Sequence, residues 1–183
     1  MKTFVYAATA VAALLAAPAA LAADRCNAAA SYDWASAGKG VTVEAFASGA
    51  TCDKTVAVFV IRDAEGTPQI WEAYPTEQNA ALAGKTTAAE TEAALKAWID
   101  QSTSIFKTTA DLPEWKEGAD APVSGEFPFY VEEGIDRENY TRIRKLAAPI
   151  FCYVSGMESM SCLYKDSDSG GLIFKVGAQS FPG

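Results

Sequence analysis

Apolar and polar positions alternate over several short segments, which is the pattern of β-strands with one buried face. The first such segment covers residues 41–47, and residues 55–61 form an apolar, β-branched run typical of a central strand. Residues 63–68 are rich in turn-forming residues, and residues 69–74 resume the strand pattern, so we expect a β-hairpin here. Residues 24–40 lack the pattern and are expected to form an irregular lead-in.

Two later segments have helical periodicity instead. The first covers residues 88–101, and the spacing of Thr87 and Glu90 predicts a capping box at its start. The second covers residues 136–148, where Asp136 can serve as the N-terminal cap and a proline follows the last residue. The sequence therefore predicts one or two helices.

The second half of the chain also contains strand patterns. An edge strand is expected over residues 126–131, because Pro128 has no N–H to donate to a neighbouring strand. Three further strands are predicted over residues 150–155, 161–165 and 172–176. The connections between these strands are short, so the sheet should be mostly antiparallel.

The first 23 residues have the layout of a secretory signal peptide. Lys2 gives a positive start, residues 5–15 form an apolar run, and small residues at 20–23 suit a cleavage site. The apolar run is too short for a membrane-spanning helix, which needs about 20 apolar residues. We therefore expect a signal peptide over residues 1–23, a single globular domain over residues 24–183, and a periplasmic or secreted product.

Four cysteines follow the expected cleavage site, and an even number in an exported protein indicates disulfides. Three pairings are possible, and we expect Cys26–Cys52 and Cys152–Cys162 because each pair is close in sequence. A CxxC motif is absent, as is any histidine to complete a mixed metal site. The sequence thus predicts an α+β fold, with a mostly antiparallel sheet and one or two helices, stapled by two disulfides.

The charge and the missing histidine exclude several function classes. Without histidine the chain has no Ser-His-Asp or Cys-His catalysis and no His-ligated metal. The formal net charge is -8, and loss of Lys2 with the signal peptide takes it to -9. An acidic protein repels phosphate backbones and anionic lipid, so we expect no nucleic-acid partner. After signal cleavage we also expect no transmembrane segment.

Three motifs for catalysis or metal binding are present only in part. Asp168-Ser169-Gly170 resembles the short signature of aspartic proteases, but the chain contains no second copy to complete a dyad. Residues 166–171 begin like a calcium-binding EF-hand loop but lack the later bidentate glutamate. The Ser36–Lys39 spacing needs a helical turn, which the neighbouring glycines oppose. We expect ordinary turns here, and no cofactor or bound metal.

A carboxylate-dependent hydrolase acting on envelope polymers is the enzymatic alternative that the residues leave open. Glu132, Glu133 and Asp136 place carboxylates near Tyr130, and glycoside hydrolysis needs two carboxyl groups across a cleft. The other interpretation is that these acids form a solvated turn.

The densest basic cluster of the chain comprises Arg137, Arg142, Arg144 and Lys145. In a helix, Arg137, Arg144 and Lys145 are expected to lie broadly on one side. Within an acidic protein such a patch suits an anionic ligand or partner. Ion pairing with the abundant carboxylates, or simple solvation of the helix face, is the alternative.

The tryptophans divide between the core and the surface. Trp71 and Tyr74 lie in a predicted strand and are expected to pack in the core. Trp115 lies in a predicted long loop over residues 111–125 and is expected to be exposed, where tryptophan often anchors a partner.

The leading hypothesis is a non-catalytic binding protein of the cell envelope. Its expected contact surface is this loop and the basic helix, and its expected partner is an envelope protein or an anionic ligand.

Overall fold

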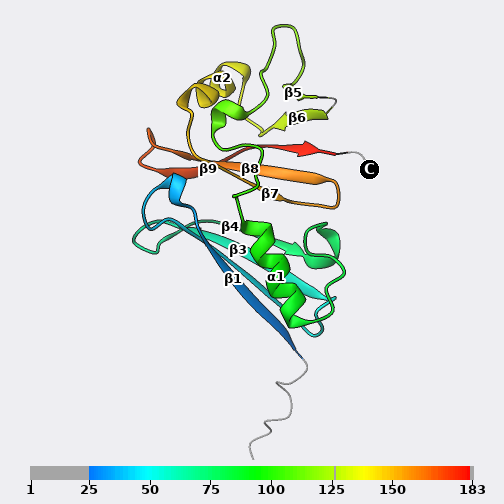
Figure 1. The fold of residues 1–183 in the computed structure, drawn as a ribbon. Helices are drawn as coiled ribbons and strands as arrows, with labels where there is room; N and C mark the ends of the chain where they lie inside the picture. The colour runs from blue at the N-terminus through cyan, green and yellow to red at the C-terminus, as the bar shows by residue number, and fades with distance from the viewer. Residues whose placement is uncertain (1–24, 126, 182–183) are drawn as a thin grey trace, which may run out of the picture.

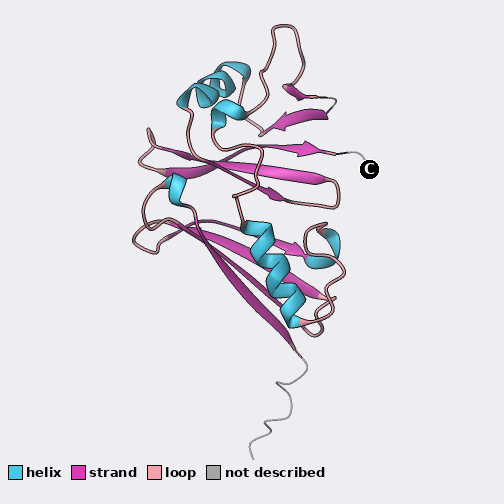
Figure 2. Ribbon diagram, viewed as in Figure 1, coloured by secondary structure: helices cyan, strands magenta, loops and turns pink. Residues whose placement is uncertain are grey.

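The computed structural model describes residues 25–125 and 127–181, and the predicted signal peptide lies outside the described residues. Two antiparallel sheets and two α-helices form most of the described chain (Figures 1 and 2). The predicted α+β class and the mostly antiparallel pairing are therefore confirmed.

Sheet 1 is a four-stranded meander, and its strands in spatial order are β1 (Cys26–Asp33), β2 (Thr42–Gly49), β3 (Thr55–Arg62) and β4 (Pro68–Pro75). The predicted hairpin is confirmed as β3 and β4. The expectation of an irregular lead-in over residues 24–40 is wrong for residues 26–33, because they form β1, which pairs with β2 along all 8 of its residues. The small side chains of Ala28 and Ala30 pack against the core, so this strand needs no large apolar residues.

Sheet 2 has five strands, in the spatial order β5 (Val123–Ser124), β6 (Phe127–Val131), β9 (Leu172–Ser180), β8 (Ser159–Asp166) and β7 (Ile150–Val154). The predicted edge position of β6 is wrong, because β6 lies between β5 and β9. The pairing of β5 with β6 spans only two residue pairs, one of which joins Val123 to Pro128. A proline is tolerated there because so little of the ladder depends on its missing N–H.

The two helices begin where the sequence predicts and end slightly earlier. In α1 (Ala88–Ile99) the side chains of Thr87 and Glu90 form the predicted capping box. In α2 (Arg137–Leu146) the Asp136 carboxylate accepts a hydrogen bond from the backbone N–H of Asn139. This helix stops before Ala147, whose φ of 47° is left-handed and ends the ladder.

The two sheets face each other across a shared core. The inner face of sheet 1, α1 and the inner face of sheet 2 together form one hydrophobic cluster, which includes Phe59, Leu95, Trp98, Phe151 and Tyr153. The opposite face of sheet 2 packs against α2 and forms a second cluster, which includes Leu112, Phe129, Tyr140, Ile143 and Val176. The order of layers is therefore α2, sheet 2, shared core and sheet 1 (Figure 1).

Side chains from other elements occupy the open edge of β7. The Gln101 amide donates to the carbonyl of Cys152 at 2.9 Å and accepts from its N–H at 3.0 Å. The carbonyl of Val154 accepts from Trp98 Nε1 at 2.8 Å and from Asn79 Nδ2 at 2.7 Å. Backbone groups that a further strand would otherwise pair with are thereby satisfied from within the chain.

Both predicted disulfides are present, joining Cys26 to Cys52 and Cys152 to Cys162. The first ties the start of β1 to the β2–β3 connection, and the second joins directly opposed residues of β7 and β8. Two disulfides are typical of a protein that folds in an oxidising compartment outside the cytoplasm. Within the described residues, neither helix combines the length and apolar character that crossing a bilayer requires.

Acid is expected to destabilise the fold through its capping carboxylates. Hydrogen bonds from the backbone N–H groups of Thr108 and Lys107 lower the pKa of Asp111, and those from Thr86 and Thr87 lower the pKa of Glu90. A carboxyl pKa that is lower in the folded state stabilises the protein above the unfolded value. That contribution is lost as the pH falls through the folded pKa. The urea midpoint should therefore drop below about pH 4.

The Asp111 contribution is tested by comparing urea midpoints at neutral and acidic pH for the wild type and Asp111→Asn. The variant should lose less stability on acidification, because the amide cannot be protonated in the same range. Asp120→Asn, in the same loop, is the control, and it should lose as much stability on acidification as the wild type. Equal losses in the wild type and Asp111→Asn would contradict the assignment.

Candidate functional site

Three of the four predicted basic residues share one exposed face of α2. Arg137, Arg142 and Lys145 line a shallow surface depression, together with the polar side chains of Asn139 and Thr141 and the single acid Glu138. The helix holds these side chains on its solvent side because Tyr140 and Ile143 direct the other side into the core. The depression therefore presents three cations and one carboxylate to solvent.

Arg144 has a different role and does not line the depression. Its Nε donates to the carbonyl of Leu112 at 2.9 Å, and a guanidinium Nη donates to that of Ala110 at 3.3 Å. Arg144 thus ties α2 to the short 3₁₀ helix Thr109–Asp111. Helical periodicity alone could not separate it from its neighbours, because it lies at the border of the buried side.

Ion pairing within the chain does not account for the cations of the depression. Among the described residues the ion pairs join Arg62 to Glu44 at 2.8 Å and Lys175 to Glu132 at 3.4 Å. Arg137, Arg142 and Lys145 take part in neither. Among the described residues, no carboxylate therefore lies within ion-pair distance of these three cations.

Trp115 is half-buried, so the expectation of an exposed loop tryptophan is wrong. Its Nε1 donates to the carbonyl of Ala119 at 2.8 Å, and its ring meets Tyr140 edge-on at a centroid distance of 5.8 Å. The Tyr140 hydroxyl donates to the carbonyl of Pro113 at 2.8 Å, and burial raises the pKa of this hydroxyl. Trp115 therefore fixes the loop onto α2, and its role in binding stays a prediction.

Two of the three candidate hydrolase carboxylates already make structural contacts. Glu132 pairs with Lys175, and Asp136 caps α2. Glu132 and Glu133 do share a second depression, lined also by Arg142, Tyr164, Phe174 and Lys175. Tyr130 is 55% exposed and does not line it. The depression thus brings two carboxylates together with two cations, and Asp136 is already engaged as a cap.

The other motifs have ordinary structural roles. The Asp166 carboxylate accepts from the backbone N–H of Asp168 at 2.9 Å, which closes the β8–β9 turn. Ser36 lies in a 3₁₀ turn that ends at Gly38, so no α-helix holds Ser36 and Lys39 together. Within residues 25–125 and 127–181, no group of three or more acids or cysteines is arranged to hold a metal ion.

A surface that the sequence did not predict lies on the side of sheet 1 away from the core. We call it the outer face, and its residues alternate with the core residues along the four strands. The register aligns them in rows across the sheet, and the apolar members are Ala29, Phe46, Val56, Val58, Val60, Trp71, Ala73 and Pro75. None of them belongs to either hydrophobic cluster. Trp71 is 67% exposed, Val56 50% and Phe46 42%, so the expected core position of Trp71 is wrong.

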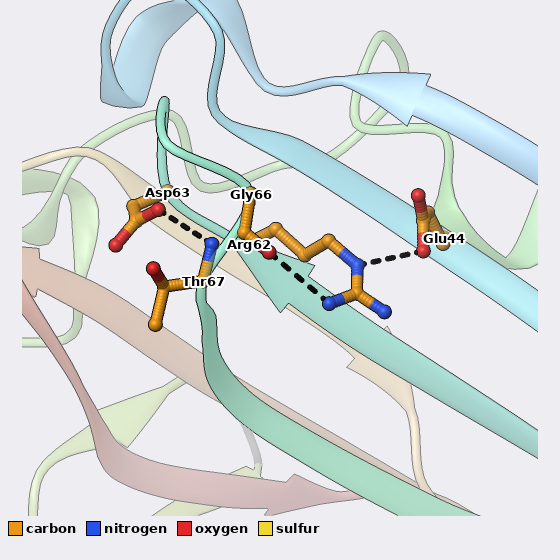
Figure 3. Close-up of polar contacts among 5 residues, drawn as sticks. All are labelled: Glu44, Arg62, Asp63, Gly66 and Thr67. Carbon is orange, nitrogen blue, oxygen red and sulfur yellow. Dashed lines mark hydrogen bonds and ion pairs between the residues drawn. The ribbon is translucent and has the colours of Figure 1, made fainter.

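An ion pair joins the row of the outer face that contains Trp71 to the end row beside it. Arg62 donates from Nε to a Glu44 carboxylate oxygen at 2.8 Å and from Nη1 to the carbonyl of Gly66 at 3.2 Å (Figure 3). Asp63 accepts from the backbone N–H of Thr67 at 2.8 Å and so holds the β3–β4 turn beside it (Figure 3). The charges of Arg62 and Glu44 therefore neutralise each other, and the rest of β2, β3 and β4 presents a mainly apolar surface.

One sequence signal did point to the outer face. Residues 55–61 are apolar at every position except the first, a pattern typical of a central strand that is buried on both faces. In the structure β3 is central within sheet 1, but only its Ala57, Phe59 and Ile61 side is buried. Packing in the core therefore does not explain why the residues on the other side, Val56, Val58 and Val60, are also apolar.

Comparison with known proteins does not identify the chain. No protein family matches its sequence, and no curated protein or solved structure is significantly similar to it. Any function assigned to the candidate sites therefore rests on the geometry of those sites alone.

Proposed function

We propose that this is a non-catalytic binding protein of the periplasm or the extracellular space, and that it holds an anionic partner on the exposed face of α2. The observation that carries the proposal is the depression lined by Arg137, Arg142 and Lys145, none of which forms an ion pair within the described chain. Solvation of a helix face remains the competing explanation, and the experiment below separates the two.

The arrangement favours an anion with several charged groups. Arginine presents planar donors that match carboxylate or phosphate oxygens, and lysine adds a mobile point charge. The formal net charge of the chain is -8, so an anionic partner would be repelled from most of the surface. Attraction confined to one helix face would then orient the partner on α2.

A carboxylate-dependent hydrolase has less geometric support. Two of its three candidate carboxylates, Glu132 and Asp136, are engaged in an ion pair and a helix cap. A catalytic pair needs one carboxyl group poised to donate a proton and the other to act as a base or nucleophile. The described contacts of these residues favour a structural role over that chemistry.

The test measures binding of the oxidised protein to immobilised inorganic polyphosphate over a series of salt concentrations. The triple variant Arg137→Gln, Arg142→Gln, Lys145→Gln should bind at least about tenfold more weakly than the wild type, because each lost cation removes a charge-assisted contact. It should also show a shallower salt dependence. Arg144 is kept, because its hydrogen bonds hold α2 in place.

The control is the triple variant Lys39→Gln, Lys54→Gln, Lys96→Gln, which removes three exposed cations elsewhere and changes the net charge equally. Its affinity should change by less than about twofold. Equal weakening by both triple variants would show that only net charge matters, and would contradict a site on α2. An absence of polyphosphate binding by the wild type would also count against the proposal.

A further inference from the structure

The outer face of sheet 1 has the composition of a contact surface. Its apolar residues are contiguous across β2, β3 and β4, and Trp71, Val56 and Phe46 expose a large part of their side chains. A monomeric protein rarely leaves so continuous an apolar patch to solvent. Helix α2, whose residues line the basic depression, lies beyond sheet 2 on the other side of the molecule (Figure 1), so the two surfaces are separate.

The outer face is large enough to form a specific interface with one other face of the same size. Each of the four strands has 8 residues. With about 3.3 Å per residue and about 4.8 Å between strands, the face covers roughly 500 Å². Two such faces packed together bury about 1,000 Å² in total, the lower limit for a specific protein interface. The exposed ring of Trp71 adds to this area.

The charge of the outer face permits contact between two copies of the chain. The chain as a whole carries a formal charge of -8, so copies repel each other over most of their surface. The charged side chains of this face are Asp33, Glu44 and Arg62, and the last two neutralise each other in an ion pair. The outer face is therefore a place where two copies meet with little electrostatic cost.

The distribution of large and small side chains also matches a second copy. One row of the register runs Ala29, Phe46, Val58, Ala73, so its β1 member is a small residue. The next row ends in Ser31 on β1 and in Trp71 on β4. A two-fold axis parallel to the strands, between β2 and β3, would place β4 of one copy over β1 of the other. The bulky Trp71 then meets the small Ala29 and Ser31.

We propose that two copies of this protein pack their outer faces together in a two-fold dimer with that axis. Aligned packing of two antiparallel sheets is a common arrangement, with about 10 Å between the sheets. The dimer explains the apolar outer side of β3 and the exposed Trp71, neither of which the core of one chain requires. It is independent of anion binding by α2.

The primary test is sedimentation of the oxidised protein over a range of concentrations. The wild type should shift from monomer to dimer as concentration rises, and Trp71→Glu should dissociate at least about tenfold more readily. Ile105→Glu is the matched control, because Ile105 is also 67% exposed but lies outside the outer face. This control should dimerise like the wild type. A wild type that stays monomeric, or equal weakening by both variants, would overturn the proposal.

Cross-linking tests the axis without a destabilising substitution. All described cysteines are in disulfides, so one added cysteine supplies a single reactive thiol. Chains carrying Ala29→Cys should cross-link through a short bismaleimide to chains carrying Ala73→Cys, while Ala80→Cys, in the chain after β4, should not cross-link. Preferential linking of two Ala29→Cys chains to each other would overturn the proposed axis. An absence of linking at both positions would overturn the dimer.

Discussion

Replacing Phe59 with alanine is expected to lower the free energy of unfolding by about 3–5 kcal/mol. The side chain is fully buried on the inner face of β3. Its ring lies 4.7 Å from that of Tyr153, 5.4 Å from that of Trp98 and 5.7 Å from that of Phe151, measured between centroids. Because these rings belong to sheet 2 and α1, the substitution leaves a cavity where three elements meet. Urea unfolding followed by circular dichroism would measure the loss.

Val56→Ala is the control for Phe59→Ala, since it lies on the same strand but on the outer face. It should cost about 1 kcal/mol or less, the scale of a strand preference. Because dimerisation would add to the stability of the wild type, the comparison is made at concentrations where the protein is monomeric. A loss below about 1.5 kcal/mol for Phe59→Ala would be inconsistent with packing of sheet 1 against sheet 2.

Removal of the Cys26–Cys52 disulfide is expected to lower the free energy of unfolding by roughly 3.5 kcal/mol. The two cysteines are separated by 26 positions, and the loop-entropy model converts this separation into the constraint on the unfolded chain. Without the bond, no cross-link ties the start of β1 to the β2–β3 connection. The double variant Cys26→Ala, Cys52→Ala, studied by thermal and urea unfolding, measures the effect.

The second disulfide provides an internal comparison. Cys152 and Cys162 are only 10 positions apart, for which the same model gives about 2.7 kcal/mol. The Cys152→Ala, Cys162→Ala variant should therefore retain more stability than the first double variant. The reverse order would show that packing around the sulfur atoms outweighs the constraint on the unfolded chain.

Much of the fold could be predicted because the clearest local sequence patterns mark helices and strands that the packed structure also contains. The capping box of Thr87 and Glu90 marked the start of α1, and the turn residues after β3 marked the hairpin. The missed strand, β1, carries alanines where a sequence pattern needs larger apolar residues. This strand also contacts α1, and a local sequence pattern does not contain such tertiary contacts.

The candidate site was less predictable, because exposure depends on how sheets stack. Sequence placed the basic residues on α2 but could not show that Arg144 reaches the carbonyls of Leu112 and Ala110. It also assigned Trp71 to the core and Trp115 to the surface, and the structure has Trp71 exposed and Trp115 half-buried. A strand alternates between two faces, and only the neighbouring layers determine which face is covered.

Side chains from α1 and the segments beside it cover the edge of β7, and this cover protects the protein from aggregation. Gln101 satisfies the outward N–H and carbonyl groups of Cys152, and Trp98 and Asn79 donate to the carbonyl of Val154. If α1 opens locally, these groups become available beside the apolar Phe151 and Tyr153. An uncovered apolar strand edge is a template for strand addition by another molecule. Conditions that loosen α1 should therefore promote fibrillar aggregation before the rest of the fold is lost.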